Sequence, residues 1–394
     1  MSVQGQCQDR FAELGQLLEK SIESGEDLGA SVAVSLEGEM VVDIYGGWAD
    51  EARTKPWQAD TLVNVWSNTK TVAALAALIL IDRGELDAFA PVAKYWPEFA
   101  ANGKEAIEVR HILSHTSGVA GWDLPVTMDD IYDLERSTSM IAAQAPWWEP
   151  GTAGGYHALA YGHLVGELVR RVTGQTIGKF VASEIAGPLG ADFHIGLDPA
   201  EDHRVSPLLV PPPLPEFDLE SLDKDSVPYK LSAAGLATDP ATANLPEWRH
   251  SEICAAGNGH GNAKSLTTIQ SIVSHEGEFG GVQLLSPETC ALIFQEQSKG
   301  SDLYLNLPIR WGIGYALSYP EAFPYLPDGR VCFWAGWGGS MVINDLDQHM
   351  TFSYVMNKME GGIIGGNING IVGGLRSEAL IRATYAALDV AVPV

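Results

Sequence analysis

Basic residues are scarce in this chain of 394 residues. Lysine and arginine number 24 against 50 aspartates and glutamates, so the formal net charge is −26 at pH 7. Nucleic acids and anionic membranes both attract proteins through a basic face. We therefore expect neither partner, and the charge also disfavours polyanionic substrates. The excess acid is otherwise typical of a solvated surface that aids solubility.

Long hydrophobic runs and clustered cysteines are absent as well. No 18 consecutive residues are apolar, so no transmembrane helix is expected. The first 25 residues have an amphipathic helical pattern and lack the basic and apolar regions of a signal peptide. The four cysteines form no CxxC pair and no metal-ligand spacing: Cys7, Cys254, Cys290 and Cys332. We expect them to be reduced, in a cytoplasmic protein. We expect no cofactor and no metal.

Two motifs of other hydrolases are also missing. No Gly-x-Ser-x-Gly elbow occurs, which argues against an α/β-hydrolase. His111 and His115 have a spacing that could bind zinc, but "HILSH" lacks the glutamate of His-Glu-x-x-His. A zinc hydrolase is therefore not expected.

Strand patterns occur at both ends of the chain, with helical patterns between them. Residues 30–48 predict a hairpin that turns at Glu37-Gly38. Residues 310–319, 329–345 and 349–357 predict three strands, and 373–388 a C-terminal helix. The predicted fold class is α+β: a largely antiparallel sheet built from both chain ends, flanked by helices, with an inserted helical lobe. We expect one domain, with a sheet lobe of about 1–84 and 250–394 and a helical lobe of about 85–249.

The segment "VWSNTKTV" (65–72) places Lys70 three residues after Ser67. Ser-x-x-Lys alone is a weak signal, and a second copy at Ser221 and Lys224 lies in an acidic, proline-flanked loop. Ser67, in contrast, precedes the apolar run "VAALAALILI", which predicts a helix through a core. A serine at a helix start is often only a cap, and that interpretation stays open here.

The catalytic interpretation of Ser67 and Lys70 has a specific physical basis. Residues i and i+3 lie on one helix face, so the Lys70 amine can reach the Ser67 hydroxyl. The unpaired N–H groups at a helix N-terminus suit an oxyanion. Lys70 can accept the serine proton only when neutral, which requires a pKa lowered by burial or by a neighbouring cation.

Two further segments are candidates for the same site. Tyr156 follows the loop "WEPGTAGG" and stands at the start of a predicted helix, where a tyrosine can also be a packing residue. The run Trp337-Gly338-Gly339-Ser340 predicts an edge strand that faces a ligand, because adjacent glycines weaken a strand unless a backbone or ligand approaches closely. The alternative for this run is a bulge or a tight turn.

These segments, in this order, resemble the serine β-lactamase and penicillin-binding-protein superfamily, and within it the family VIII carboxylesterases. The resemblance covers most of the chain. It extends to five further stretches: "HILSHTSGV" (111–119), "WEPGT" (148–152), "YHALAYG" (156–162), "GNGHGNAKSL" (257–266) and "LLSPET" (284–289).

The resemblance implies roles for the candidate residues. Ser67 would be the nucleophile, Lys70 its base and Tyr156 the tyrosine that shuttles protons. The backbone N–H groups of Ser67 and Ser340 would form the oxyanion hole. A substrate pocket would be lined by Trp337, Gly338 and Gly339, with the tryptophans beside the motifs: Trp66, Trp122 and Trp148.

Two departures from the family pattern favour a neutral ester over a β-lactam. Trp337 stands where penicillin-recognising members carry a lysine, and Ala158 stands where many β-lactamases have an asparagine. A cation 4 Å from a carboxylate is worth about 4 kcal/mol at an effective dielectric constant of 20. We expect a serine carboxylesterase for small neutral, short-chain esters. The alternatives are an acyltransferase, a weak β-lactamase or D-aminopeptidase-type hydrolase, and a non-catalytic ligand-binding relative.

Overall fold

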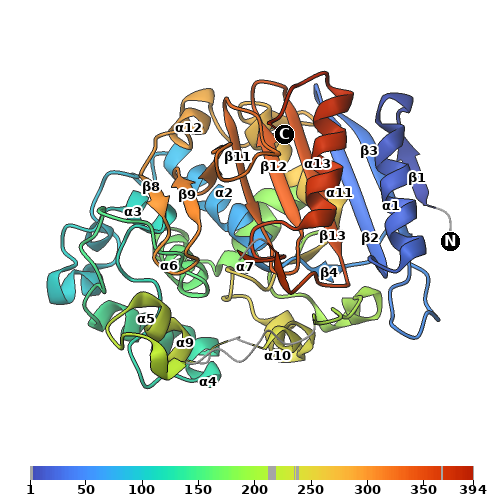
Figure 1. Ribbon diagram of the computed structural model, residues 1–394. Coiled ribbons are helices and arrows are strands. Elements are labelled where there is room, and N and C mark those ends of the chain that lie inside the picture. The colour runs from blue at the N-terminus through green and yellow to red at the C-terminus, as the bar shows by residue number, and fades with distance from the viewer. Residues whose placement is uncertain (1–2, 212–218, 235, 237–238, 365–366, 394) are drawn as a thin grey trace.

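The fold is organised around a nine-stranded sheet in which every neighbouring pair is antiparallel (Figure 1). The computed structural model describes residues 3–211, 219–234, 236, 239–364 and 367–393. In spatial order the strands are β1 (Gln4–Cys7), β3 (Glu39–Gly47), β2 (Gly29–Leu36), β13 (Met350–Met356), β12 (Met341–Asp345), β11 (Val331–Ala335), β10 (Ala316–Leu317), β9 (Pro308–Trp311) and β8 (Ser298–Ser301).

The two ends of the chain meet at the centre of this sheet. Strand β2 pairs along its length with β13, from Ala30 opposite Met356 to Leu36 opposite Met350. Both strands are buried almost throughout, and their sequences are mostly apolar with a few buried hydroxyl side chains. The predicted antiparallel sheet built from both chain ends is confirmed, and so is the α+β fold class.

The predicted hairpin at Glu37-Gly38 is also present. Strands β2 and β3 pair antiparallel up to Leu36 opposite Glu39, and both turn residues have positive φ, 49° and 84°. Such a two-residue turn matches the right-handed twist of the strands it joins.

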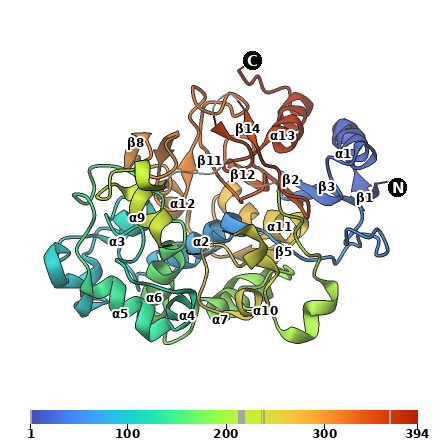
Figure 2. The same ribbon diagram turned by 60° about the horizontal axis from the view of Figure 1, so that its bottom comes forward.

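Helices cover both faces of the sheet (Figures 1 and 2). α1 (Ala12–Ser24) and α13 (Leu375–Ala387) lie side by side on one face, and α11 (Ala263–Ser274) and α2 (Thr69–Asp82) lie on the other. Every residue of α2 from Thr69 to Leu80 is buried. The apolar run after Ser67 is thus a helix through the core, as predicted.

Most of the remaining helices gather beyond the β8–β11 side of the sheet, at the lower left of Figure 1. Within the described ranges, no helix is both long and apolar enough to cross a membrane. The helices labelled on that side are α3 (Val109–Leu113), α4 (Met128–Tyr132), α5 (Leu134–Ala143), α6 (Ala160–Thr173) and α9 (Val227–Ala233). α7 (Ile177–Val181) and α10 (Pro246–His250) lie nearer the centre of the view, α12 (Pro287–Leu292) lies near β8, and the short α8 (Gly187–Leu189) follows α7 in the chain.

Short strand pairs complete the structure. One of them, between β4 and β5, leads into the start of α2 and so fixes the backbone ahead of Ser67. The pairs are β4 (Val63–Asn64) with β5 (His260–Gly261), β6 (Glu278–Phe279) with β7 (Val282–Gln283), and β14 (Ile363–Ile364) with β15 (Asn367–Ile368).

One strand prediction is wrong in an informative way. Residues 329–345 form a hairpin, β11 and β12, and the run Trp337–Ser340 is its turn rather than an edge strand. Gly338 and Gly339 have φ values of 97° and 105°, which residues with a side chain rarely adopt. The alternative of a tight turn is therefore correct, and the turn lies at the end of two interior strands.

Smaller differences concern element boundaries. Strand β1 is an exposed edge strand that has no apolar alternation to predict it. Residues 310–319 contain parts of two short strands, β9 and β10. Tyr156 lies in an extended segment four residues before α6, because that helix begins at Ala160. Part of the proline-rich stretch 206–230 lies outside the described residues.

Candidate active site

Ser67 is presented by a strained backbone turn at the start of α2. The preceding residue, Trp66, has a φ of 47°, a conformation that costs on the order of 1–3 kcal/mol for a non-glycine residue. Hydrogen bonds hold it: the Trp66 N–H donates to Asn64 Oδ1 at 3.1 Å, and its carbonyl accepts from Thr69 Oγ1 at 2.5 Å. A short 3₁₀ turn, Trp66–Asn68, then leads into the helix. Ser67 is left half-buried, with its side chain free to meet other groups.

Lys70 lies one helical turn further on and is almost fully buried, with 2% of its surface exposed. Its Nζ is 3.1 Å from Ser67 Oγ, 2.8 Å from the Ala158 carbonyl oxygen and 2.7 Å from the Ala256 carbonyl oxygen. The pKa of Lys70 is well below its ordinary value, because burial penalises the ammonium form. No carboxylate is hydrogen-bonded to this amine among the described residues.

Tyr156 approaches Ser67 from the other side. Its hydroxyl donates to Ser67 Oγ at 2.6 Å and accepts from the Trp334 indole N–H at 3.2 Å. Burial raises the pKa of Tyr156, so the phenol holds its proton near neutral pH. The Lys70 Nζ also lies 4.7 Å from the centre of the Tyr156 ring. Ser67, Lys70 and Tyr156 thus form one hydrogen-bonded group.

The backbone of Tyr156 is fixed by a buried carboxylate, Asp302. One of its oxygens accepts the Tyr156 N–H at 3.1 Å, and the other accepts the Trp311 indole N–H at 3.2 Å. The Trp311 ring lies parallel to the Tyr156 ring with centroids 6.3 Å apart. The His115 ring also packs on Tyr156, at 5.0 Å between centroids.

The predicted oxyanion donors are available for a ligand. Within the part of the chain that the structure describes, the amide N–H groups of Ser67 and Ser340 donate to no protein acceptor. The β11–β12 turn packs directly against the backbone before Ser67, since a Cβ placed on Gly336 would lie 2.3 Å from the Val65 carbonyl oxygen. Asn68 Nδ2 holds the Ser340 side chain at 3.0 Å.

The predicted pocket residues divide into three groups. Trp66 and the half-buried Trp337 are in contact, with ring centroids 5.2 Å apart. Trp148 packs over Gly155 and meets the His157 ring edge-on, next to Tyr156. Trp122 lies elsewhere: its N–H donates to the Ser137 carbonyl and its ring meets the His163 ring, and among the described residues no hydrogen bond or ring contact joins it to the Ser67 group.

Several residues of the site have no sequence feature that marked them as functional. No site role is predicted from the sequence for Trp334 or Trp248, yet Trp334 bonds Tyr156 and Trp248 packs on Trp66 at 5.7 Å. The carbonyls of Ala158 and Ala256 have no side-chain signature at all. Asp302 could have been suspected only as an acidic residue destined for burial.

The residues around the site give no indication of a metal centre. In the described ranges, no group of three or more His, Cys, Asp or Glu side chains is arranged to hold a metal ion. His115 is buried, its Nδ1 accepts the His157 N–H at 3.1 Å, and burial lowers its pKa well below the ordinary value. These contacts make His115 a neutral packing residue beside Tyr156.

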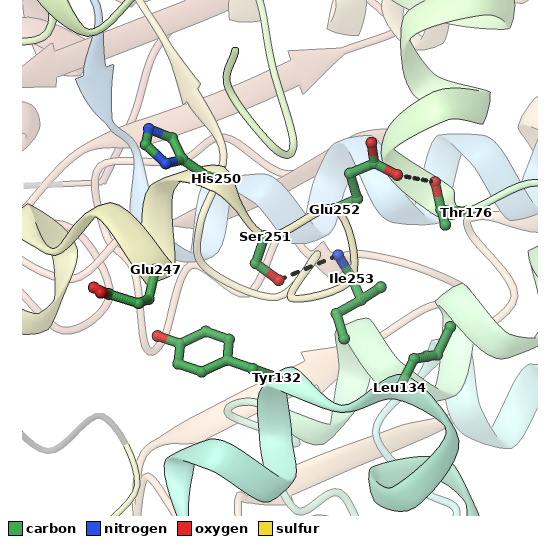
Figure 3. A pocket seen from close by; sticks show the side chains of 8 residues that line it. All are labelled: Tyr132, Leu134, Thr176, Glu247, His250, Ser251, Glu252 and Ile253. Atoms are coloured by element: carbon green, nitrogen blue, oxygen red, sulfur yellow. Dashed lines mark hydrogen bonds between the residues drawn. The ribbon is translucent and has the colours of Figure 1, made fainter. Parts of the chain in front are cut away.

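An open pocket of about 520 Å³ lies apart from the Ser67 group, between α10 and the α4–α5 corner (Figure 3). It contains the side chains of Tyr132, Leu134, Thr176, Glu247, His250, Ser251, Glu252 and Ile253, and thus no member of the Ser67 group. The segment that lines it continues to Ala256, whose carbonyl holds Lys70.

Comparison with known proteins shows the family of this chain. Residues 14–363 match the protein family described as Beta-lactamase. The chain is 31% identical over 357 residues to the esterase/beta-lactamase LipL of Mycobacterium tuberculosis, covering 88% of this chain and 80% of that protein. A crystal structure of a family VIII carboxylesterase is 35% identical, covering 98% of this chain and all of that one, with a TM-score of 0.89. A penicillin-binding protein homolog from Caulobacter crescentus is 36% identical at the same coverage, with a TM-score of 0.87.

The antiparallel sheet, the buried helix behind Ser67 and these matches define a class of hydrolases that share one fold. The chain belongs to the β-lactamase family. The resemblance that the motifs indicated is confirmed, including the similarity to a family VIII carboxylesterase.

Proposed function

We propose that this protein is a serine carboxylesterase that hydrolyses small neutral esters through an acyl-enzyme. The observation that carries the proposal is the position of Ser67 Oγ, 3.1 Å from Lys70 Nζ and 2.6 Å from the Tyr156 hydroxyl. A serine hydroxyl becomes a nucleophile when an adjacent base takes its proton. Relatives named as an esterase/beta-lactamase and as a family VIII carboxylesterase support the ester substrate.

Counting the hydrogens at Ser67 supports Lys70 as the base. A neutral amine has two N–H donors and one lone pair. The Ala158 and Ala256 carbonyls can take both donors, which leaves the lone pair facing Ser67. Tyr156 keeps its own proton and donates it to Ser67 Oγ, so the serine hydrogen is left to point toward Lys70.

Acylation then follows from this arrangement. Ser67 Oγ bonds to the ester carbonyl carbon while its proton passes to Lys70. The carbonyl oxygen becomes an oxyanion, held by the Ser67 and Ser340 N–H groups, each of which contributes about 10²–10³ in rate. The bond to the alcohol breaks, and the leaving oxygen takes the proton of Tyr156. The acyl-enzyme therefore holds a Lys70 ammonium and a Tyr156 phenolate.

Deacylation restores the starting state without a separate proton transfer between Lys70 and Tyr156. Water adds to the acyl carbon and gives a proton to the Tyr156 phenolate. The bond to Ser67 Oγ breaks, and that oxygen takes its proton back from Lys70. Positioned proton transfers of this kind contribute about 10²–10⁴ in rate.

The experiment is a panel of p-nitrophenyl esters of increasing chain length, run beside nitrocefin, with an active-site serine phosphonate as a label. We expect turnover of short esters, labelling of Ser67, and a loss of about 10⁶ in kcat for Ser67→Ala. Ser221→Ala, in the second Ser-x-x-Lys, serves as the matched control and should keep full activity. An active Ser67→Ala enzyme, or an inactive Ser221→Ala enzyme, would overturn the assignment. Added alcohol tests whether the acyl group passes to an alcohol instead of water.

A further inference from the structure

The Tyr156 hydroxyl has a second partner that the cycle above does not use. The indole N–H of Trp334, the penultimate residue of strand β11, lies 3.2 Å from the phenol oxygen. Trp334 is buried, with 3% of its surface exposed. An indole N–H can only donate, so Trp334 occupies a lone pair of the phenol oxygen. The phenolic proton is left to point toward Ser67.

A neighbouring tryptophan shows that this contact is not simply ring packing. Trp311 and Trp334 lie against each other, 4.7 Å between centroids, and both contact the Tyr156 ring. The N–H of Trp311 points away from the phenol, to Asp302 Oδ2 at 3.2 Å. The two tryptophans therefore have the same size and both pack on Tyr156, and they differ in the acceptor that each N–H meets.

We propose that Trp334 is a positioning residue that directs the Tyr156 proton toward Ser67 and the leaving alcohol and stabilises the phenolate left behind. This inference rests on the proposed esterase function and deepens it.

Stabilisation of the Tyr156 phenolate is needed in the step in which the alcohol leaves. The carbon–oxygen bond breaks, the alcohol oxygen takes the phenolic proton, and the negative charge stays on the Tyr156 oxygen. Burial keeps bulk water from solvating that charge, so the groups already in place must do so. These groups are the Trp334 N–H and the Lys70 ammonium, 4.7 Å from the ring centre. A hydrogen bond to an ionised acceptor is roughly twice as strong as a neutral one.

This role makes the effect of Trp334 depend on the leaving group. An alkyl alcohol is a poor leaving group that needs the Tyr156 proton as it departs. p-Nitrophenolate is a stable anion and leaves without that proton. Without Trp334, Tyr156 is a weaker acid, so alkyl esters should lose rate and p-nitrophenyl esters should lose much less.

The test compares kcat/KM for ethyl butyrate and p-nitrophenyl butyrate in Trp334→Phe and in the control Trp311→Phe. Each variant loses one indole N–H and the same volume. We expect the alkyl-to-aryl rate ratio to fall about 10- to 100-fold in Trp334→Phe, the loss of one hydrogen bond to a charged group. Trp311→Phe removes a bond to Asp302 and not to the phenol, so it should slow both esters together and leave the ratio near the wild-type value. Both rates come from one preparation, so their ratio does not depend on the fraction of folded enzyme. Trp334→Met, which also lacks the N–H and fills irregular space flexibly, should reproduce the change.

The outcomes separate this inference from the proposed function. If the wild-type enzyme hydrolyses both esters, and the ratio in Trp334→Phe and Trp334→Met equals that of Trp311→Phe, the role of Trp334 is overturned and the esterase stands. If the wild-type enzyme hydrolyses neither ester and the phosphonate does not label Ser67, both proposals are wrong.

Discussion

Burial acts on Lys70 and Tyr156 in the same way and changes their pKa values in opposite directions. It disfavours the charged form of each group, which is the ammonium of Lys70 and the phenolate of Tyr156. The pKa of Lys70 falls and that of Tyr156 rises. Burial therefore favours a neutral amine and a neutral phenol on either side of Ser67.

The pH dependence of kcat/KM follows from these two directions. The proposed mechanism requires neutral Lys70, so the rate should rise with pH as Lys70 loses its proton, at a lower pH than the ordinary lysine value of about 10.4. Activity also requires protonated Tyr156, whose raised pKa places the falling limb above the ordinary value of about 10. Both limbs belong to the coupled pair rather than to single residues.

The measurement is a pH profile with a short-chain ester on wild-type enzyme and on Lys70→Ala. Lys70→Ala should lose at least two decades in rate and the rising limb with it. A rising limb that persists unchanged in the residual activity of Lys70→Ala would show that another group is the base.

Two tyrosines near the site provide a matched pair of substitutions. Tyr156→Phe removes the hydroxyl that bonds Ser67 and should lower kcat by about two to four decades. Tyr161 is equally buried, and its hydroxyl has no hydrogen-bond partner among the described residues. Tyr161→Phe should therefore keep its activity and its thermal stability, because it removes only an unsatisfied buried polar group. A dead Tyr161→Phe enzyme, or a fully active Tyr156→Phe enzyme on several esters, would refute the assignment of Tyr156.

At the scale of elements, the β11–β12 turn depends on a residue from another segment, Glu360. The Glu360 N–H donates to the Gly338 carbonyl at 2.9 Å. Its carboxylate accepts the Leu375 N–H at the start of α13, at 3.0 Å, and pairs with the Arg376 guanidinium at 3.2 Å. A Cβ on Gly339 would lie 2.8 Å from that carboxylate. Glu360 therefore ties the turn that carries Ser340 to the N-terminus of α13.

Replacing Glu360 should loosen this turn. We expect Glu360→Gln to lower kcat, by no more than the 10²–10³ that a whole oxyanion donor contributes, with KM nearly unchanged. The Glu360–Arg376 pair is almost fully buried, but Arg376 keeps its pair with Asp27, so the melting temperature should fall by less than the loss of about 3–5 kcal/mol for a buried charge left unpaired would imply. Steady-state kinetics and thermal unfolding measure the two effects.

The control for this substitution lies on the same helix. Glu378 pairs with Arg382 one turn apart, and both side chains are about one-third exposed. Exposed pairs of this spacing contribute about 0.3–0.5 kcal/mol, so Glu378→Gln should change neither kcat nor stability appreciably. An unchanged kcat in Glu360→Gln would show that the turn does not need this carboxylate.

At the scale of the whole molecule, the net charge of −26 and Trp337 disfavour the same substrates. An anionic β-lactam should meet long-range repulsion on approach, and the family resemblance implies that Trp337 replaces the lysine that would bind its carboxylate. Neutral esters experience neither effect. We expect kcat/KM for p-nitrophenyl butyrate to exceed that for nitrocefin by orders of magnitude.

A change in ionic strength separates the long-range repulsion by the net charge from the local effect of Trp337. Raising the ionic strength shortens the Debye length from about 30 Å at 0.01 M to about 8 Å at 0.15 M, so long-range repulsion weakens. The kcat/KM for nitrocefin should rise with salt, and that for the neutral ester should stay constant. Comparable kcat/KM values for the two substrates at low salt would contradict the expected preference.

Features set by neighbours in the chain could be predicted from the sequence alone. The turn at Glu37-Gly38, the buried helix after Ser67 and the i, i+3 relation of Ser67 to Lys70 all depend on local geometry, which repeats in every helix and hairpin. The order of the motifs along the chain also predicted the family and the fold. The glycine pair at 338–339 gave a wrong strand, because a run of β-type residues does not by itself show where the chain reverses.

Only the tertiary structure decided which groups meet at Ser67. Tyr156 reaches it across 89 residues, and the Ala158 and Ala256 carbonyls hold Lys70 across 88 and 186. Among the tryptophans, Trp334 bonds Tyr156 while Trp122 packs in the helical region. A backbone carbonyl is the same in every residue, and an indole packs equally well in a core or beside a catalytic tyrosine. The direction of each hydrogen bond is therefore fixed by the path of the folded backbone and not by residue type.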